Sequence, residues 1–171
     1  MTAILPDETS LASLLGTVEE AMTGKVLAVA ADTPADLAAR RLEQAAVSGA
    51  PVVDRGRVVG VVTLRDLIAP ALAAGVNAQT TGPFLRHEHH LARYRVHELM
   101  TGEPVTARAG WPLARVVVAM EDAGVNRVPV VDGDGRPVGI LTRDDVLRAI
   151  ARALRPRRTT PAARGSLMAA D

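Results

Sequence analysis

The chain has 171 residues, a hydrophobic fraction of 48% and a formal net charge of +1 at pH 7. This length suits one body built from two small subdomains, and the apolar content is ample for a core, which argues against a disordered chain. Because cysteine is absent, a disulfide framework and a thiolate metal site are excluded. Aromatic residues make up only 2% of the chain, which disfavours a base-stacking surface for nucleic acid.

The sequence also lacks signals for a membrane or an export route. Residues 1–8 have neither the basic flank nor the apolar stretch of a signal peptide. The longest charge-free apolar run, 67–78, is well short of the roughly 18 residues that a membrane-spanning helix requires. We therefore expect a soluble cytoplasmic protein with no membrane partner.

The first elements expected along the chain are a short helical turn, a strand and a helix. Thr17 and Glu20 stand at capping-box spacing, at which a hydroxyl and a carboxylate satisfy the first amides of a helix. The short apolar run 26–29 predicts a buried strand. Thr33 and Pro34 then predict the start of a helix, with Thr33 as the N-cap and Pro34 as the first helical residue.

A β-hairpin and a second helix follow. The β-branched runs 51–53 and 57–62 flank a short turn that ends in Gly56, which is typical of a hairpin. The closing helix is expected to begin at Thr63, because Asp66 again stands at capping-box spacing. The resulting unit is β-α-β-β-α with a helical lead-in.

The whole pattern then occurs a second time. Three signatures are duplicated: Met22-Thr23-Gly24 with Met100-Thr101-Gly102, Pro51-Val52-Val53-Asp54 with Pro129-Val130-Val131-Asp132, and Gly60-x-x-Thr63-x-x-Asp66 with Gly139-x-x-Thr142-x-x-Asp145. In the second copy Arg95 replaces the capping residue of the lead-in, Pro112 again opens a helix, and the first strand is expected over 105–107. A repeat this regular predicts two copies of one supersecondary unit that bury apolar faces against each other.

The duplication divides the chain into five segments. They are an N-terminal segment 1–16, a first repeat 17–73, a linker 74–93, a second repeat 94–153 and a basic tail 154–171. The Arg-rich tail is expected to be a solvated, flexible end. Its alternative role is a contact with nucleic acid, an acidic protein or a lipid surface.

The duplicated Thr-x-x-Asp sequence has two interpretations. The structural one is a capping box, in which the Thr hydroxyl and the Asp carboxylate satisfy helix amides and no ligand is needed. In the functional one, the helix start that follows each hairpin attracts a phosphate through its free N–H groups and dipole. The Thr hydroxyl then donates to the phosphate, and the Asp accepts hydrogen bonds from the vicinal hydroxyls of a ribose.

These signatures resemble a tandem pair of cystathionine-β-synthase-type (CBS) domains, called a Bateman module, over residues 17 to about 153. The resemblance implies an α+β fold of two pseudo-twofold-related units packed sheet to sheet. It also implies clefts that bind adenosine derivatives such as AMP, ADP, ATP or S-adenosylmethionine. A regulatory role such as energy sensing, a regulated partner protein and a homodimer are expected on the same ground, with neither enzymatic activity nor a required cofactor.

The resemblance further assigns site residues by position. Thr63 and Thr142 correspond to phosphate-binding hydroxyls, and Asp66 and Asp145 to ribose-binding carboxylates. Each cleft is expected to combine residues of both repeats: Thr63, Arg65 and Asp66 with Val105, Val125, Asn126 and Arg127, and Thr142, Arg143 and Asp145 with Leu27, Val47, Ser48 and Gly49. Core packing is the alternative for the valines and the leucine.

The two predicted clefts differ in charge. The first has Arg65 and Arg127 where the second has Asp144 and Gly49. Because a carboxylate opposes phosphate binding and an arginine favours it, the Asp66 cleft is expected to bind polyphosphorylated nucleotides more tightly than the cleft that contains Asp145.

The histidines are a weaker candidate for chemistry. All of them lie close together in the sequence, at His87, His89, His90 and His97. On a helix, His87, His90 and His97 could bind Zn²⁺ or Ni²⁺, but their spacing differs from the His-Glu-x-x-His pattern, and an exposed linker is the ordinary explanation. We therefore expect no metal site.

Three functions follow from these observations. The leading one is a regulatory module that senses an adenosine-containing nucleotide between its repeats and modulates a partner. A CBS-fold interaction or scaffold protein, with both Thr-x-x-Asp sequences acting only as caps, is the first alternative. A nucleic-acid-associated regulator that uses the Arg-rich tail is the second, although nucleic acid is not the expected partner.

Overall fold

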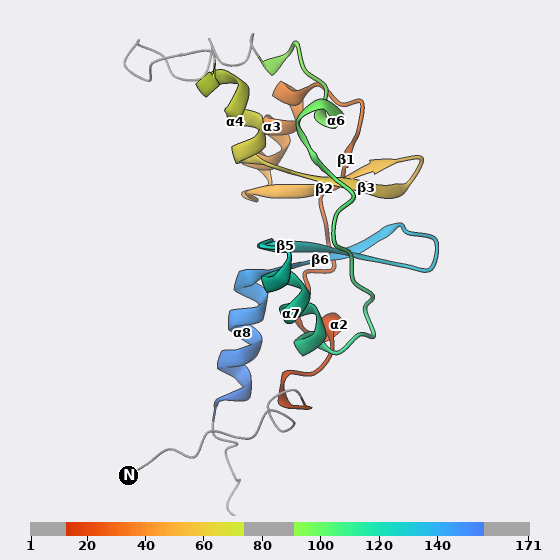
Figure 1. The fold of residues 1–171 in the computed structure, drawn as a ribbon, viewed down its shortest axis with the longest axis vertical. Helices are drawn as coiled ribbons and strands as arrows, with labels where there is room; N and C mark the ends of the chain where they lie inside the picture. Colours follow the sequence, from red (N-terminus) through yellow and green to blue (C-terminus); the bar gives the residue numbers. More distant parts are fainter. Residues whose placement is uncertain (1–12, 74–90, 156–171) are drawn as a thin grey trace, which may run out of the picture.

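The structure, a computed structural model, describes residues 13–73 and 91–155, whose elements form two stacked halves (Figure 1). One half contains β1 (Val29–Ala30), α3 (Ala35–Gln44), β2 (Gly49–Asp54), β3 (Arg57–Thr63) and α4 (Leu64–Ala73). The other contains α7 (Leu113–Asp122), β5 (Arg127–Val131), β6 (Pro137–Thr142) and α8 (Arg143–Ala153). The short elements α2 (Val18–Ala21), α6 (Val96–Leu99) and β4 (Thr101–Gly102) complete the described fold.

The two sheets face each other at the centre of the molecule, and the helices cover their outer sides (Figure 1). The first sheet has the strand order β1-β2-β3-β4, and the second consists of β5 and β6. This arrangement confirms the predicted α+β fold of two units packed sheet to sheet. In the described ranges, no helix combines the length and apolar character that a membrane span requires.

The register of the two hairpins positions the candidate site. Gly49, the first residue of β2, pairs with Thr63 at the end of β3. Arg127, the first residue of β5, pairs with Thr142 at the end of β6. Gly49 and Arg127 therefore occupy equivalent positions in the two repeats, each beside the threonine that begins the closing helix.

The first strand of each repeat is shorter than expected. In the first repeat, β1 covers only Val29 and Ala30, where a strand over 26–29 was expected. In the second repeat, Ala107 forms a single parallel bridge with Val130 in place of a strand over 105–107. The main-chain bonds at this bridge, Ala107 N–H to Pro129 O at 3.0 Å and Val131 N–H to Ala107 O at 2.9 Å, hold the segment to β5 without extending it.

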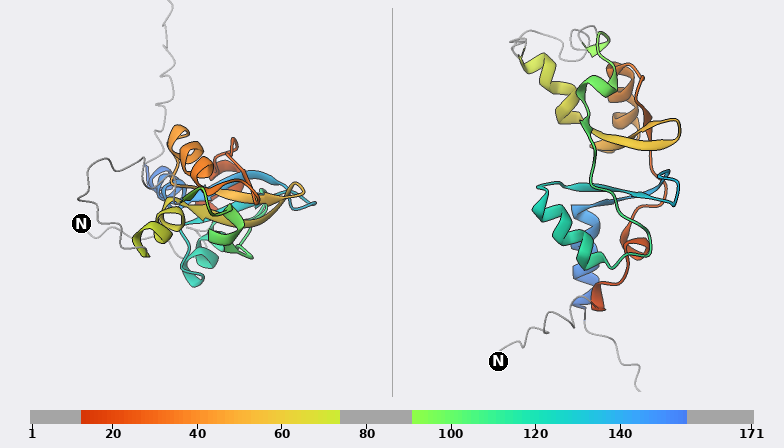
Figure 2. Two further views of the ribbon diagram at one scale, coloured as in Figure 1. Left: turned by 90° about the horizontal axis from the view of Figure 1, so that it is seen from above. Right: turned by 45° about the vertical axis from the view of Figure 1, so that its right-hand side comes forward.

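The two lead-in segments, which contain α2 and α6, are exchanged between the repeats. The repeat pattern did not predict this arrangement. In Figure 2, α2 lies in the half that contains α7 and α8, and α6 lies in the half that contains α3 and α4. Val18 N–H donates to Trp111 O at 2.9 Å, and Val96 N–H donates to Thr33 O at 3.0 Å. Each half of the molecule thus joins the body of one repeat to the lead-in of the other.

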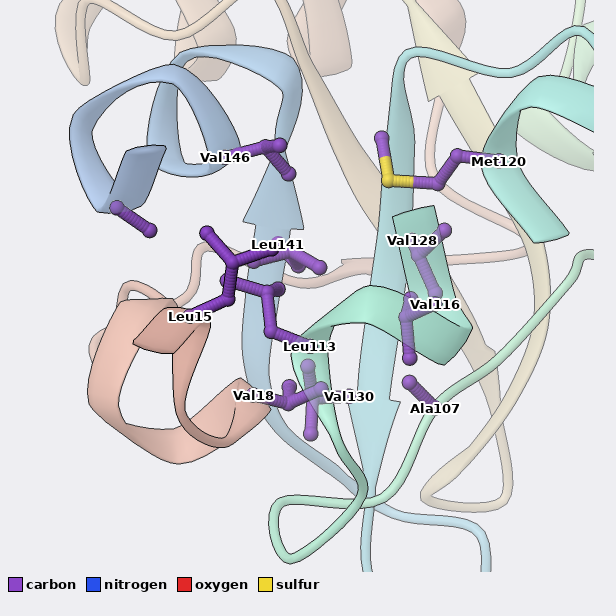
Figure 3. Close-up of a cluster of buried hydrophobic side chains, with 11 residues drawn as sticks. Leu15, Val18, Ala107, Leu113, Val116, Met120, Val128, Val130, Leu141 and Val146 are labelled. Atoms are coloured by element: carbon purple, nitrogen blue, oxygen red, sulfur yellow. The ribbon is translucent and has the colours of Figure 1, made fainter. Parts of the chain in front are cut away.

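The exchanged segments contribute to both hydrophobic cores. Leu15 and Val18 are buried among residues of the second repeat, including Leu113 and Leu141 (Figure 3). The core of the first repeat is completed by Leu91 and Val96. Leu91, which the sequence analysis assigned to the linker, is therefore a core residue with 7% of its surface exposed.

The exchange also changes how two helices begin. The expected N-cap Thr33 does not cap α3: the helix starts at Ala35 and Pro34 is its N-cap, with a non-helical ψ of 136°. The incoming lead-in accounts for this shift, because Thr33 O accepts the Val96 amide and Ala35 N–H donates to Tyr94 O at 3.0 Å. The same correction applies to the other repeat, where Pro112 is the N-cap of α7.

Replacing Val18 with Ala tests the exchanged packing. Val18 is fully buried, so we expect the free energy of unfolding of the protein to fall by about 2 kcal/mol. Val118→Ala is the matched control, because Val118 is 59% exposed and its loss is expected to have little effect. Urea denaturation followed by fluorescence of Trp111, the only tryptophan, measures both variants. Equal losses in the two variants would contradict the burial of Val18 in this core.

Candidate ligand-binding site

Thr63 and Asp66 connect the end of β3 to the first turn of α4. Asp66 Oδ2 accepts hydrogen bonds from Thr63 N–H and from the Thr63 hydroxyl, both at 2.8 Å. The Asp66 amide donates to Thr63 Oγ1 at 3.3 Å. These bonds complete a capping box. Within the described residues, Asp66 Oδ1 receives no hydrogen bond and is therefore available as an acceptor.

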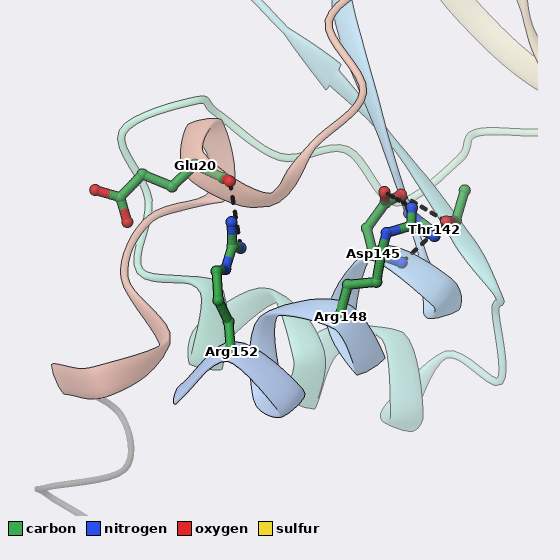
Figure 4. A network of polar contacts seen from close by, with 5 residues as sticks. All are labelled: Glu20, Thr142, Asp145, Arg148 and Arg152. Carbon is green, nitrogen blue, oxygen red and sulfur yellow. Dashed lines mark hydrogen bonds and ion pairs between the residues drawn. The ribbon is translucent and has the colours of Figure 1, made fainter. Parts of the chain in front are cut away.

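Thr142 and Asp145 make the same bonds at the start of α8, but their surroundings differ (Figure 4). The Asp145 side chain is only 3% exposed, and its Oδ1 accepts a hydrogen bond from Arg148 Nη2 at 2.5 Å. Both carboxylate oxygens of Asp145 are thus used within its own repeat. This carboxylate is a buried structural group, whereas Asp66 is only partly buried and keeps one oxygen open.

A second feature of both helix starts lies in the main chain. Leu64 N–H donates to Ser48 O at 3.0 Å, and Arg143 N–H donates to Asn126 O at 3.0 Å. The first amide of α4 and that of α8 therefore already have acceptors, which reduces the number of N–H groups that either helix offers to an anion. Sequence reasoning missed these bonds, because they depend on the loop before each hairpin.

Arg127 reaches from the second repeat to the first. Its Nη2 donates a hydrogen bond to Ser48 Oγ at 2.9 Å. The guanidinium also lies against Gly49, where an added Cβ would be 2.9 Å from Arg127 Cζ and would overlap Nη1. The arginine of one repeat thus occupies the space that the glycine at the equivalent position of the other repeat leaves open.

Burial and a nearby carboxylate act on Arg127 in opposite directions. Partial burial lowers the pKa of Arg127, and the negative charge of Asp66 raises it again in part. An arginine nevertheless stays protonated at neutral pH. The structure therefore places a permanent cation from the second repeat near the carboxylate of the first, which combines Asp66, Thr63, Arg127, Ser48 and Gly49 in one region.

The remaining predicted site residues occupy three kinds of position. The side chains of Val105 and Val125 pack against the core of the second repeat, and Leu27 packs against that of the first. Exposed positions include those of Arg65, Asn126, Arg143 and Val47. Ser48 and Gly49, predicted beside Thr142, contact Arg127 and adjoin Thr63.

Comparison with known proteins decides the family. The model of the CBS domain matches residues 18–71 and again residues 96–152. The chain belongs to the CBS domain family. The predicted tandem CBS pair is therefore confirmed, and proteins of this kind are generally regulatory modules rather than enzymes.

Relatives of this CBS pair include proteins of similar and of greater length. A CBS domain-containing protein of Dictyostelium discoideum is 30% identical over 145 residues, which cover 81% of this chain and 94% of the relative. The chloroplastic CBS domain-containing protein CBSX2 of Arabidopsis thaliana is 31% identical over 131 residues. That alignment covers 68% of this chain, and the CBS pair spans about half of the relative, 55% of its length.

Solved structures of CBS pairs share the fold. The crystal structure of CBSX2 from Arabidopsis thaliana has a TM-score of 0.68 at 31% identity and covers 80% of this chain and 95% of that one. Its complex with AMP has a TM-score of 0.65 at 31% identity, with coverages of 82% and 99%. The CBS domain pair of protein MJ0100, in complex with 5′-methylthioadenosine and S-adenosylmethionine, has a TM-score of 0.62 at 28% identity, with coverages of 77% and 97%.

The histidine candidates lie mostly outside the described part of this CBS pair. His87, His89 and His90 fall outside the described residues. His97 is exposed on α6, with its Nδ1 3.0 Å from Ala31 O. Within residues 13–73 and 91–155, no three His, Cys, Asp or Glu side chains come together as a metal site would require.

One cavity lies away from all of the predicted site residues. It has a volume of about 530 Å³ between the N-terminal lead-in and α8. Its lining combines apolar and charged residues: Leu14, Leu15, Glu20, Ala149, Arg152, Ala153 and Arg155. Arg152 Nη2 donates to Glu20 O at 3.4 Å beside it, which ties α8 to the exchanged lead-in (Figure 4).

Proposed function

We propose that this CBS pair binds an adenosine-containing nucleotide at the region formed by Thr63, Asp66 and Arg127, and that binding modulates a partner protein. The observation that carries the proposal is the contact of Arg127 of the second repeat with Ser48 and Gly49 of the first, where Gly49 pairs with Thr63. A carboxylate suited to ribose hydroxyls, that of Asp66 bonded to Thr63, and a guanidinium suited to phosphate thus belong to the same region. The complexes of CBSX2 with AMP and of the MJ0100 pair with S-adenosylmethionine support this class of ligand.

The Asp66 region is a better ligand site than the Asp145 region. Asp66 Oδ1 can accept a hydrogen bond from a ribose hydroxyl without breaking a bond that the protein already makes. Asp145 is only 3% exposed and its Oδ1 already accepts from Arg148, so it would have to become exposed before it could do the same. We therefore infer that the second region acts mainly as a helix cap.

The regulatory effect follows from the origin of the site residues. Thr63 and Asp66 belong to the first repeat, and Arg127 belongs to the second. A ligand that contacts both repeats favours the relative arrangement in which both contacts are made, which is a shift of population between arrangements. The protein acts as a module without catalysis of its own. Its cytoplasmic location, its homodimeric state and a role in energy sensing stay predictions.

Two measurements test the ligand class. Mass spectrometry of small molecules released from the purified protein is expected to detect an adenosine-containing compound. In a thermal-shift panel of AMP, ATP, S-adenosylmethionine and adenosine, a ligand present at 100 times its dissociation constant is expected to stabilise the fold by about 2.7 kcal/mol. A flat response to the whole panel, with no released compound, would reject the proposal.

One observation favours a second candidate function. Both Thr-x-x-Asp sequences form complete capping boxes from their own side chains and amides. The CBS fold therefore has its helix starts satisfied as it stands, as expected for an interaction or scaffold protein. The flat thermal response described above is the result that this alternative predicts.

A further inference from the structure

The contact between Ser48 and Arg127 joins the two repeats directly beside the proposed site. Ser48 precedes β2 and is exposed, whereas Arg127 is partly buried against Gly49. The bond from Arg127 Nη2 to Ser48 Oγ, at 2.9 Å, connects side chains that are 79 positions apart in the sequence. One N–H group of the guanidinium therefore donates to a neutral hydroxyl of the opposite repeat.

We propose that Ser48 is a specificity-determining residue, because it holds Arg127 in an orientation from which an anionic ligand must release it. This inference rests on the proposed function, since it concerns ligands of the same region. The Ser48–Arg127 hydrogen bond is hereafter called the latch. A phosphorylated ligand recruits the guanidinium and opens the latch, whereas a neutral nucleoside leaves it closed.

The relative strengths of the two hydrogen bonds determine the direction of this exchange. A hydrogen bond between a guanidinium and a phosphate is charge-assisted at both ends and roughly twice as strong as one between neutral groups. The serine hydroxyl offers Arg127 a neutral acceptor at the protein surface. Phosphate therefore displaces Ser48, but every phosphorylated ligand binds more weakly than it would without the serine.

Opening the latch also separates the repeats at one point. Ser48 O accepts the first amide of α4, so the residue that holds Arg127 belongs to the same loop that begins the Thr63 helix. When Arg127 leaves Ser48, the start of β2 loses its side-chain bond to β5. The charge of the ligand thus determines whether the repeats keep this link.

The control variant lies away from every predicted site residue. Val118 is on α7, is 59% exposed and was assigned to neither cleft. Val118→Ala therefore truncates an exposed side chain without touching the latch or the proposed site.

Calorimetric titration of the full chain with AMP and with adenosine tests the competition. Ser48→Ala is expected to raise the affinity for AMP about threefold to tenfold, the factor that corresponds to one net hydrogen bond. The affinity for adenosine is expected to stay unchanged, and Val118→Ala is expected to alter neither. An unchanged or lower AMP affinity in Ser48→Ala would overturn the proposal, because Ser48 would then be a bystander or a direct ligand contact.

A second measurement tests the latch without any ligand. In a double-mutant cycle of Ser48→Ala and Arg127→Gln, followed by urea unfolding, we expect a stabilising coupling between the two positions. Zero coupling would overturn the latch whatever the titrations show. If the coupling is present but wild-type protein binds neither AMP nor adenosine, the proposed function fails and the latch stands as a link between the repeats.

Discussion

Asp66→Ala is expected to lower the affinity for the bound nucleotide by about tenfold to a hundredfold. The change removes the open carboxylate oxygen that we assign to the ribose, and a hydrogen bond to a charged group contributes about 1.5–3 kcal/mol. It also removes one helix cap, which is expected to cost about 1 kcal/mol of stability. Titration well below the melting temperature measures the affinity of the folded protein.

Asp145→Ala is the matched comparison, and it is expected to give the opposite pattern. Asp145 is buried and accepts bonds from Thr142 N–H, the Thr142 hydroxyl and Arg148. Its loss leaves the partly buried Thr142 amide without this acceptor and empties a buried position, so the free energy of unfolding is expected to fall by about 3 kcal/mol. Nucleotide affinity is expected to change less than in Asp66→Ala. A larger loss of affinity from Asp145→Ala would show that the ligand sits in the other cleft.

The features that could be predicted from the sequence are those that depend on local chemistry. Thr142 caps α8 because a hydroxyl and a carboxylate three residues apart satisfy the same helix start in any surroundings. Glu20 accepts the Thr17 amide at 3.1 Å for the same reason. Glu98 accepts the Arg95 amide at 2.6 Å in the same way, although Arg95 stands where the first repeat has the capping threonine. The acidic half of a capping box therefore works without the hydroxyl half.

The lead-in exchange could not be predicted, because a repeated sequence does not say which copy a segment packs against. Val18 would be an apolar residue of a short helix in either arrangement. The loss of Thr33 as a cap and the burial of Leu91 both follow from the exchange, so these errors share one cause.

The Arg127 contact was predicted only in part. The sequence shows that Gly49 stands where the other repeat has Arg127, which predicts a difference in charge between the clefts. It does not show that the arginine fills the space above the glycine and bonds to Ser48. That contact depends on how the two sheets face each other, which is a property of the assembled repeats.

Gly60→Ala and Gly139→Ala are each expected to lower the free energy of unfolding by about 2 kcal/mol or more. These glycines of the duplicated signature lie where the exchanged lead-ins cross the sheets. A Cβ on Gly60 would lie 2.9 Å from Thr101 O, and a Cβ on Gly139 would lie 3.0 Å from Thr23 O. Because these oxygens belong to the main chain, the lead-in itself must move, and overpacking of this kind is destabilising.

The duplicated methionines add to this expected cost without being its main source. Met100 Sδ would overlap a Cβ on Gly60, and Met22 Sδ would be 2.5 Å from one on Gly139. A methionine side chain is flexible and can turn away, but the Thr101 carbonyl beside it cannot. Combining Met100→Ala with Gly60→Ala is therefore expected to leave most of the loss in place, as urea unfolding would measure.

Two other glycines of the same signatures separate this effect from the general cost of replacing glycine. Gly24 and Gly102 have no heavy atom within 4 Å of an added Cβ and do not have a positive φ. Alanine at either position is expected to be neutral or to stabilise the protein by up to about 1 kcal/mol, because it restricts the unfolded chain. If Gly102→Ala proved as harmful as Gly60→Ala, the close crossing of the lead-in would not be the reason for the glycine. The presence of Gly60 and Gly139 in the duplicated signature would then need another explanation.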